Sequence, residues 1–169
     1  MQPGDEIVLI VDADNKPLGK VPRKIMRQQG LIHRASYILV FNREGKILVQ
    51  KRTLRKDIYP GWYDVATGGV LLADDETWPA AAARELAEEL GVHKARLAAH
   101  FDFYHEDGGN RVWGRLFSAR CDGPFRLQEE EVAEAFFLPV EEALSLSEKE
   151  PFTPDGIMVL KRFLAGGGG

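Results

Sequence analysis

Short apolar runs, each bounded by polar or glycine-rich turns, follow one another along the chain. Runs with the composition of β-strands lie at 7–11, 18–21, 36–41, 46–51, 64–69, 95–104, 111–120 and 133–139. Asp14-Asn15, NREG at 42–45 and EDGGN at 106–110 each separate two such runs. These three stretches are therefore predicted to be the turns of hairpins.

Four segments have helical patterns, at 23–29, about 78–90, 139–146 and 154 to about 164. Thr77 and Thr153 are placed to cap the second and the fourth, while Gly30 and Gly91 follow the first and the second as stop signals. Strands and helices mix without a regular βαβ rhythm. This order favours an α+β fold in which a mixed sheet lies between helices.

A chain of 169 residues without a linker or an internal repeat predicts one domain. We place it at residues 1–165, with an N-terminal hairpin and short helix at 1–32 and the core at 33–165. The glycine run at 166–169 is expected to be a flexible tail.

The helix predicted at 78–90 carries acids beside an apolar stripe. The stripe comprises Ala82, Ala83, Leu86 and Leu90. Glu85, Glu88 and Glu89 are spaced so that their side chains meet on a neighbouring side of the helix, where like charges cost roughly 0.2–0.5 kcal/mol per pair. A divalent cation that prefers oxygen ligands would reverse that cost. The alternative is a solvated, glutamate-rich helix face.

This region resembles the Nudix box, whose pattern is G-x5-E-x7-R-E-U-x-E-E-x-G-U, with U a bulky aliphatic residue. Glu76 and, seven residues later, the run Arg84-Glu85-Leu86-Ala87-Glu88-Glu89-Leu90-Gly91-Val92 match it without a gap. The pattern places its glycine at position 70, whereas the glycine here is Gly69. One extra residue therefore lies in the loop between the glycine and the helix.

The resemblance implies a Nudix fold, with a mixed sheet between helices and the box as loop–helix–loop. It also implies hydrolysis of a diphosphate linked to another group. By this resemblance Glu85, Glu88 and Glu89 bind Mg²⁺ or Mn²⁺, and Glu76 pairs with Arg84 to hold the loop. Gly69 has no side chain, so its carbonyl is a candidate to complete the metal shell.

The chain also resembles a group of bacterial Nudix hydrolases close to isopentenyl-diphosphate isomerase, through the stretches at 33–41, 48–64 and 112–114. The isomerase needs a cysteine and a glutamate for proton transfer. Thr67 stands at the cysteine position, and Arg115 follows Trp113-Gly114 where the glutamate is required. Isomerase activity is therefore a weak alternative.

Arg52, Arg55 and Lys56 follow a predicted strand and precede the Pro60-Gly61 turn, so they are candidate diphosphate contacts. A solvated basic loop is the alternative. Glu131 and Glu134 lie at the start of a later strand, where Nudix relatives often carry a carboxylate. Each is a candidate general base or extra metal ligand, and each is as readily explained as a charged strand end.

Composition narrows the classes of partner. The net charge of −4 gives no basic field for nucleic acid, and no apolar run approaches the roughly 20 residues of a membrane span. With one cysteine and no leader pattern, we expect a cytoplasmic protein without an intramolecular disulfide. A homodimer is left open.

The sequence predicts a metal-dependent pyrophosphohydrolase acting on a small-molecule diphosphate. The alternative from another class is a Nudix-like module that binds a nucleotide or regulates without hydrolysis. The pattern does not identify the substrate.

Overall fold

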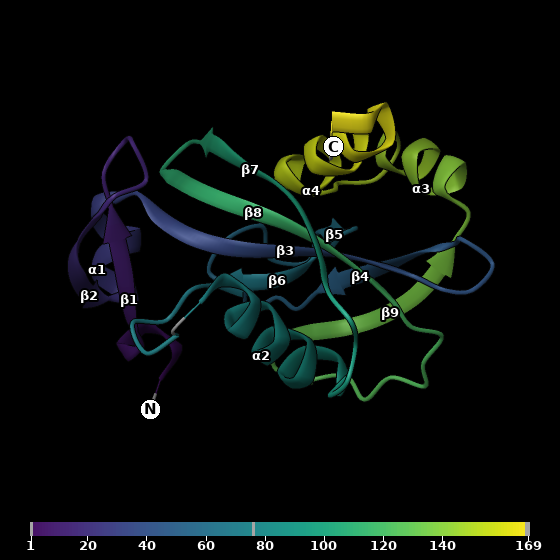
Figure 1. The fold of residues 1–169 in the computed structure, drawn as a ribbon, viewed down its shortest axis with the longest axis horizontal. Helices are drawn as coiled ribbons and strands as arrows, with labels where there is room; N and C mark the ends of the chain where they lie inside the picture. Colours follow the sequence, from purple (N-terminus) through teal and green to yellow (C-terminus); the bar gives the residue numbers. More distant parts are fainter. Residues whose placement is uncertain (1, 76, 168–169) are drawn as a thin grey trace.

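The β-strands form a mixed sheet between helices on its two faces (Figure 1). The structure is a computed structural model that describes residues 2–75 and 77–167. Helix α2 covers one face, and helices α3 and α4 cover the other. This arrangement confirms the expected α+β class with its α/β/α layers.

The bounds of the elements, in chain order, are η1 Pro3–Asp5, β1 Ile7–Val11, β2 Pro17–Pro22, α1 Arg23–Gln29, β3 His33–Phe41, β4 Ile47–Arg52, β5 Tyr63–Asp64, β6 Thr67–Val70, α2 Trp78–Leu90, β7 Ala98–Asp107, β8 Asn110–Arg120, β9 Val132–Leu138, α3 Val140–Ser147, α4 Pro154–Arg162 and η2 Phe163–Gly167.

Strand β3 is the centre of the sheet. It runs parallel to β8 from His33↔Val112 to Phe41↔Arg120, and antiparallel to β6 over 35–38. The turn at 42–45 does join β3 to β4, but the two strands pair only at Phe41↔Ile47. The expected hairpin is thus limited to its turn, because β3 bonds to β6 and β8 while β4 bonds to β5 and β9.

Alternation along β3 divides the core into two apolar layers. Ile38 and Val40 pack with α2, whereas Tyr37 and Leu39 pack with α3 and α4. Both layers are buried, so β3 is a nearly continuous apolar run with helices on each side.

The N-terminal hairpin β1–β2 and helix α1 lie at one end of the sheet (Figure 1). Strand β1 joins the sheet at Ile10↔His33, and α1 ends at Gly30 in the left-handed conformation with φ of 60°. Met26 packs against Val8 and Val70. This packing fixes the orientation of α1 relative to strand β6.

The helix ends show one success and one error of sequence interpretation. The Thr77 hydroxyl accepts a hydrogen bond from the Ala80 N–H at 3.1 Å, which confirms the cap of α2. Thr153 occupies the N-cap position of α4, but its side chain makes no capping bond. It is instead buried beside Asp64 and Gly156.

At the C-terminus, Gly166 and Gly167 belong to η2, and residues 168–169 lie outside the described residues.

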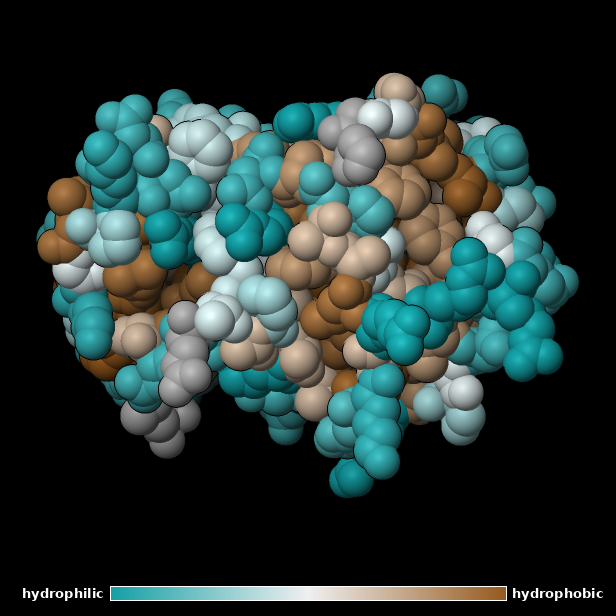
Figure 2. Space-filling view, in the orientation of Figure 1, coloured by the Kyte–Doolittle hydropathy of each residue, from teal (hydrophilic) through white to brown (hydrophobic). Residues whose placement is uncertain are grey.

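Hydrophilic and hydrophobic residues are interspersed on the face seen in Figure 2. Within the described part of the chain, none of the helices has the length and apolar character needed to cross a membrane.

Candidate metal and diphosphate site

The buried face of α2 carries two carboxylates as well as apolar side chains. Glu85 and Glu89 are 8% and 6% exposed, on the same face as Ala82 and Leu86, whereas Glu88 is exposed. Ala83 is exposed as well and does not belong to the apolar stripe; Ala81 does. Glu85 and Glu89 therefore do not lie on a separate side of the helix, because at 100° per residue both positions fall inside the arc of the buried residues.

Backbone from β6 lies directly against the first of these acids. A Cβ atom added at Gly69 would lie 2.8 Å from Glu85 Oε1, closer than real Cβ contacts. A larger residue here would force the Glu85 carboxylate to move, whereas glycine leaves it in place. The contact brings main chain and carboxylate together, as the sequence predicts for Gly69.

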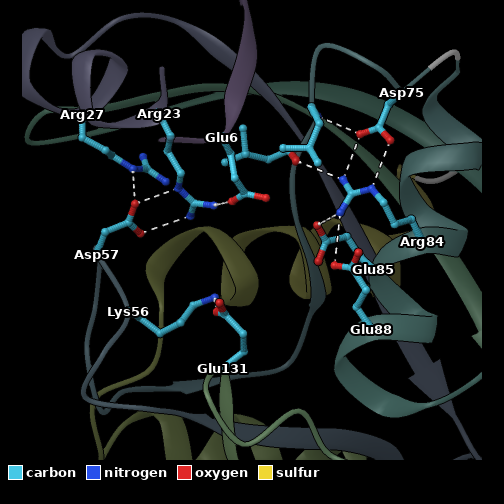
Figure 3. Close-up of polar contacts among 12 residues, drawn as sticks. Glu6, Arg23, Arg27, Lys56, Asp57, Asp75, Arg84, Glu85, Glu88 and Glu131 are labelled. Carbon is cyan, nitrogen blue, oxygen red and sulfur yellow. Dashed lines mark hydrogen bonds and ion pairs between the residues drawn. The ribbon is translucent and has the colours of Figure 1, made fainter. Parts of the chain in front are cut away.

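Arg84 is held by a network of acids (Figure 3). Its Nε and Nη2 donate to the two oxygens of Asp75 at 3.0 and 2.8 Å, and its Nη1 donates to Glu85 at 2.9 Å and Glu88 at 3.3 Å. Asp75 also accepts the N–H of Leu72 at 2.7 Å, which fixes the loop before α2. Burial acts to lower the pKa of Arg84, but the bonds to Asp75 and the charges of the three acids raise this pKa above its usual value.

Burial and mutual repulsion disfavour the ionised carboxylates. Burial is the main cause that raises the pKa of Glu89, and the neighbouring charge of Glu85 adds to it. Burial likewise raises the pKa of Glu85, against the opposing effect of Arg84. A cation or hydrogen-bond donors near two buried acids that repel each other stabilise their ionised forms.

A basic wall faces α2 across a pocket. Its members Arg23 and Lys56 line a pocket of about 230 Å³ together with Glu85, Glu88 and Glu89. Figure 3 shows Arg23, Lys56 and Glu131 across from the α2 acids, with Lys56 directed toward Glu131. The cations of this wall are paired with acids, Arg23 with Glu6 at 3.6 Å and Lys56 with Glu131. Their N–H groups are the donors on this side of the pocket that suit the phosphates of a metal-bound ligand.

A second arginine of α1 supports this wall. Arg23 and Arg27 both donate to Asp57, each through Nε at 2.9 Å. The charges of both arginines hold the pKa of Asp57 well below its usual range, although burial acts in the opposite direction. Arg27 Nη1 also donates to Asn110 at 3.1 Å. The bonds to Asp57 link α1 to the loop that carries Lys56.

The NUDIX domain model matches residues 31–161. The chain belongs to the Nudix family. It is 45% identical over 159 residues to the uncharacterized Nudix hydrolase PA4841 of Pseudomonas aeruginosa, covering 94% of each chain. It is 46% identical over 155 residues to the uncharacterized Nudix hydrolase YfcD of Escherichia coli K12, covering 92% of this chain and 84% of that protein.

Solved structures agree with the fold. DR0079 of Deinococcus radiodurans superposes with a TM-score of 0.81 at 20% identity, covering 93% of this chain and 98% of that one. The NUDIX domain of NrtR from Shewanella oneidensis, solved with ADP ribose, gives a TM-score of 0.65 at 16% identity, with 79% and 86% covered.

Family membership makes this chain a Nudix hydrolase, an enzyme that cleaves the pyrophosphate bond of small-molecule diphosphates. Nudix hydrolases generally need divalent cations. In the described residues no three acids, histidines or cysteines already converge on one point that could hold a metal. Arg84 Nη1 lies between the carboxylates of Glu85 and Glu88 and donates to both. The donor set nevertheless fits a hard cation: it offers carboxylate oxygens and close backbone, and it carries excess negative charge.

The Nudix-box residues Arg84, Glu85, Glu88, Glu89 and Gly69 lie together, as expected. Glu76 lies outside the described residues. Among the described residues of the loop before α2, the acid that accepts hydrogen bonds from Arg84 is Asp75. Counted forward from Gly69, the acid of the box falls on Asp75; counted back from Arg84, it falls on Glu76. The extra loop residue creates this ambiguity, so the sequence pointed to one acid of an adjacent pair.

The remaining candidates separate by position. Lys56 and Glu131 line the pocket of about 230 Å³ between α2 and the basic wall, which we call the Nudix pocket. Glu134 is exposed on β9 and is absent from the residues that line this pocket. Arg52 lies on the far side of the pocket wall, where its Nη1 is 3.8 Å from a carboxylate oxygen of Asp64. Arg55 is exposed and lines an outer groove. Arg23, Arg27 and Asp57 were not predicted, since no short-range pattern joins α1 to the loop after β4.

Proposed function

We propose that this Nudix hydrolase uses Mg²⁺ or Mn²⁺ to cleave an organic diphosphate in the pocket between α2 and the basic wall. The observation that carries the proposal is the pair of buried carboxylates, Glu85 and Glu89, opposite Arg23 and Lys56 across that pocket. The acids suit the metal, and the cations suit phosphate oxygens that remain free of the metal.

Glu85, Glu88, Glu89 and the Gly69 carbonyl are the groups that would hold the cation. Once bound, the metal supplies charge neutralisation and a water of lowered pKa. Arg84 positions Glu85 and Glu88 and is itself held by Asp75. This division of labour makes Arg84 a positioning residue.

The reaction transfers a phosphoryl group to water. A water oxygen forms a bond to one phosphorus, the bond from that phosphorus to the bridging oxygen breaks, and the bridging oxygen leaves on the other phosphate. A carboxylate takes the proton that the water loses. Glu131 is the preferred base because it lines the pocket beside Lys56, and Glu134 is the weaker candidate because it is exposed.

Arg52 and Lys56 remain the proposed diphosphate contacts, and Arg23 joins them. Lys56 and Arg23 border the Nudix pocket directly, whereas Arg52 lies behind it and Arg55 outside it. Arg55 is therefore assigned to the outer part of a longer substrate. The homodimer and the cytoplasmic location stay predictions.

The test is a hydrolysis screen of the purified protein. Nucleotides, nucleotide sugars, dinucleotides and isoprenoid diphosphates would each be incubated with Mg²⁺, with Mn²⁺ or with chelator. Glu89→Gln is the inactive comparison, and Glu142→Gln, an exposed acid on α3, is the matched control. Phosphate release that needs metal, survives in Glu142→Gln and disappears in Glu89→Gln supports the proposal; release without metal contradicts it.

A non-catalytic binding module is the second candidate, favoured by the bonds of Arg84 to Glu85 and Glu88. Ligand binding without metal-dependent turnover in the same screen would establish it. Isomerase activity has no structural support at position 67. Thr67 is buried and its hydroxyl accepts from the Gln50 amide, so no thiol is present for proton transfer.

A further inference from the structure

The two cations of the basic wall differ in how firmly they are held. Arg23 donates to Asp57 through Nε at 2.9 Å and through Nη2 at 3.2 Å, and its Nη1 lies 3.6 Å from Glu6. Lys56 donates to Glu131, which within residues 2–75 and 77–167 is the one acid paired with it. The position of the Lys56 ammonium group therefore depends on a single carboxylate.

The backbone that carries this pair is fixed by other bonds. The Thr53 N–H donates to the Glu131 carbonyl at 3.2 Å, and the Thr53 hydroxyl donates to the Glu130 carbonyl at 2.7 Å. These bonds join the loop after β4 to the turn before β9. A lysine has a flexible four-carbon stem and three donors, so the Lys56 ammonium can change its partner while the backbone stays in place.

Both members of the pair face the acids of α2. Lys56 and Glu131 line the Nudix pocket, and Figure 3 shows them across from Glu85 and Glu88. Burial is the main cause that raises the pKa of Glu89, and the charges of Lys56 and Glu131 then act on this pKa in opposite directions. A diphosphate bound beside Glu89 would therefore be attracted by Lys56 and repelled by Glu131.

The Lys56–Glu131 pair is largely shielded from solvent. The Lys56 side chain is 11% exposed and that of Glu131 is 26% exposed, so water and salt screen their charges less than they would at an open surface. Lys56 also lines a smaller space of about 70 Å³ with Asp64 and Asp155, which we call the inner cavity, yet its bond is to Glu131. A diphosphate carries more charge than one carboxylate and is the stronger competitor for the same ammonium.

We infer that the Lys56–Glu131 pair is an exchange contact, in which the diphosphate of the substrate takes the Lys56 ammonium and thereby leaves Glu131 free to accept the proton of the attacking water. Before the substrate binds, the ion pair holds Lys56 in place and masks Glu131. This inference rests on the proposed function, which assigns the diphosphate to the Nudix pocket and the role of base to Glu131. Glu131 then has two opposite effects, because it competes with the substrate for Lys56 and promotes turnover.

Binding can be measured apart from turnover with methylenediphosphonate and Mg²⁺, because the P–C–P bridge of this probe resists hydrolysis. Isothermal titration calorimetry would compare wild type, Lys56→Met, Glu131→Gln and the double variant. Glu131→Gln should lower the Kd about threefold, since Lys56 no longer gives up an ion pair on binding. Lys56→Met should raise the Kd about threefold in the wild type but about tenfold in the Glu131→Gln background, where the ammonium is unpaired.

Two other results would overturn the inference. If Glu131 only repels the probe, Glu131→Gln will lower the Kd as much with methionine at position 56 as with lysine. If Glu131 instead orients Lys56 for the probe, Glu131→Gln will raise the Kd. Differential scanning fluorimetry of each variant verifies that it is folded.

Turnover supplies the opposite effect of the same substitution. On the best substrate of the screen, Glu131→Gln should lower kcat by about 10²-fold or more, as expected for loss of a general base. Glu130→Gln is the matched control: it removes the same charge from an exposed neighbour that does not line the Nudix pocket, and it should leave kcat and the Kd of the probe unchanged. An unchanged kcat in Glu131→Gln would overturn the release of a base.

The two assays separate this inference from the proposed function. If no substrate is hydrolysed but the four Kd values show the expected coupling, the hydrolase proposal fails and the exchange contact holds. If metal-dependent hydrolysis is lost in Glu89→Gln but the four Kd values show no coupling, the hydrolase proposal holds and the exchange contact fails. A wild type that does not bind the probe in the presence of Mg²⁺ would contradict both.

Discussion

Two pairs of buried acids lie on either side of β6. Glu85 and Glu89 belong to one helix, four residues apart, and face the Nudix pocket. Asp64 and Asp155 come from β5 and the first turn of α4, far apart in the sequence, and face the inner cavity. Burial raises the pKa of Asp64 to about 7, as it raises the pKa values of the α2 acids.

The two pairs differ in how their charge is offset. Arg84 donates a hydrogen bond to Glu85, and Lys56 lies nearby. In the inner pair, Asp64 lies 3.8 Å from Arg52, and Asp155 accepts a hydrogen bond from the Tyr37 hydroxyl. The α2 pair lies at the Nudix pocket, where we propose that it binds the metal. The inner pair lies in the inner cavity, a space of about 70 Å³ whose lining also carries Arg23, Arg27, Arg52 and Lys56. The volume and the cations around each pair are what distinguish these similar acids.

The largest effect is expected from Glu89→Gln. Turnover should fall by about 10³-fold or more, which is over about 4 kcal/mol of barrier, because the variant lacks one of the metal-binding carboxylates. Without metal its melting temperature should not fall, since the amide avoids the cost of a buried charge. Differential scanning fluorimetry with Mn²⁺ should show a rise in the wild type and none in Glu89→Gln. Unchanged turnover would remove Glu89 from the site.

The inner pair should make stability depend on pH. The folded-state pKa of Asp64, about 7, lies above its unfolded value of about 3.9. Its contribution is therefore fully present below about pH 4 and is lost as the pH rises through about 7. At roughly 1.4 kcal/mol per pH unit, the loss reaches at most about 4 kcal/mol.

Urea unfolding of the wild type and Asp64→Asn between pH 4 and pH 8 would measure this dependence. The variant should gain stability relative to the wild type as the pH rises. Parallel curves for the two proteins would show that Asp64 is ionised in the folded state throughout and that the two pairs differ more than burial suggests.

Of the two acid pairs, the one on α2 could be predicted from the sequence, because its members lie close together in the chain. A helix repeat places Glu85 and Glu89 together whatever the rest of the chain does, and the box pattern adds Arg84 and Gly69. The sequence did not indicate that Asp64 and Asp155 lie close together, because this proximity depends on how α4 packs on the sheet. The need for glycine at position 156 also depends on a distant residue, since a Cβ atom there would lie 2.3 Å from Asp64 Oδ1.

The mixed sheet could be predicted from the strand patterns. The strands that pair with β3 could not, since strand composition does not specify pairing.

A smaller effect is expected at the loop that positions the α2 pair. Asp75→Asn removes the charged bonds to Arg84, which should lower stability by about 2 kcal/mol and turnover by about tenfold. Asp74→Asn is the matched control, since Asp74 is the exposed neighbour. Chemical denaturation of Asp75→Asn and Glu76→Gln, beside this control, decides which acid holds the loop. If Glu76→Gln is the more destabilised, the assignment of Asp75 is wrong.

The smallest effect is expected at the border that the two pairs share. Arg23 lines both the Nudix pocket and the inner cavity, so Arg23→Ala should raise KM about tenfold and change kcat less. Lys24→Ala, its neighbour on α1, is the control: that side chain is 57% exposed and pairs with Asp5. Steady-state kinetics on the best substrate, with Arg23→Lys as a partial rescue, would measure this contact. Equal KM values in Arg23→Ala and Lys24→Ala would restrict phosphate recognition to Arg52 and Lys56, and Lys56 would then be the cation that the two acid pairs share.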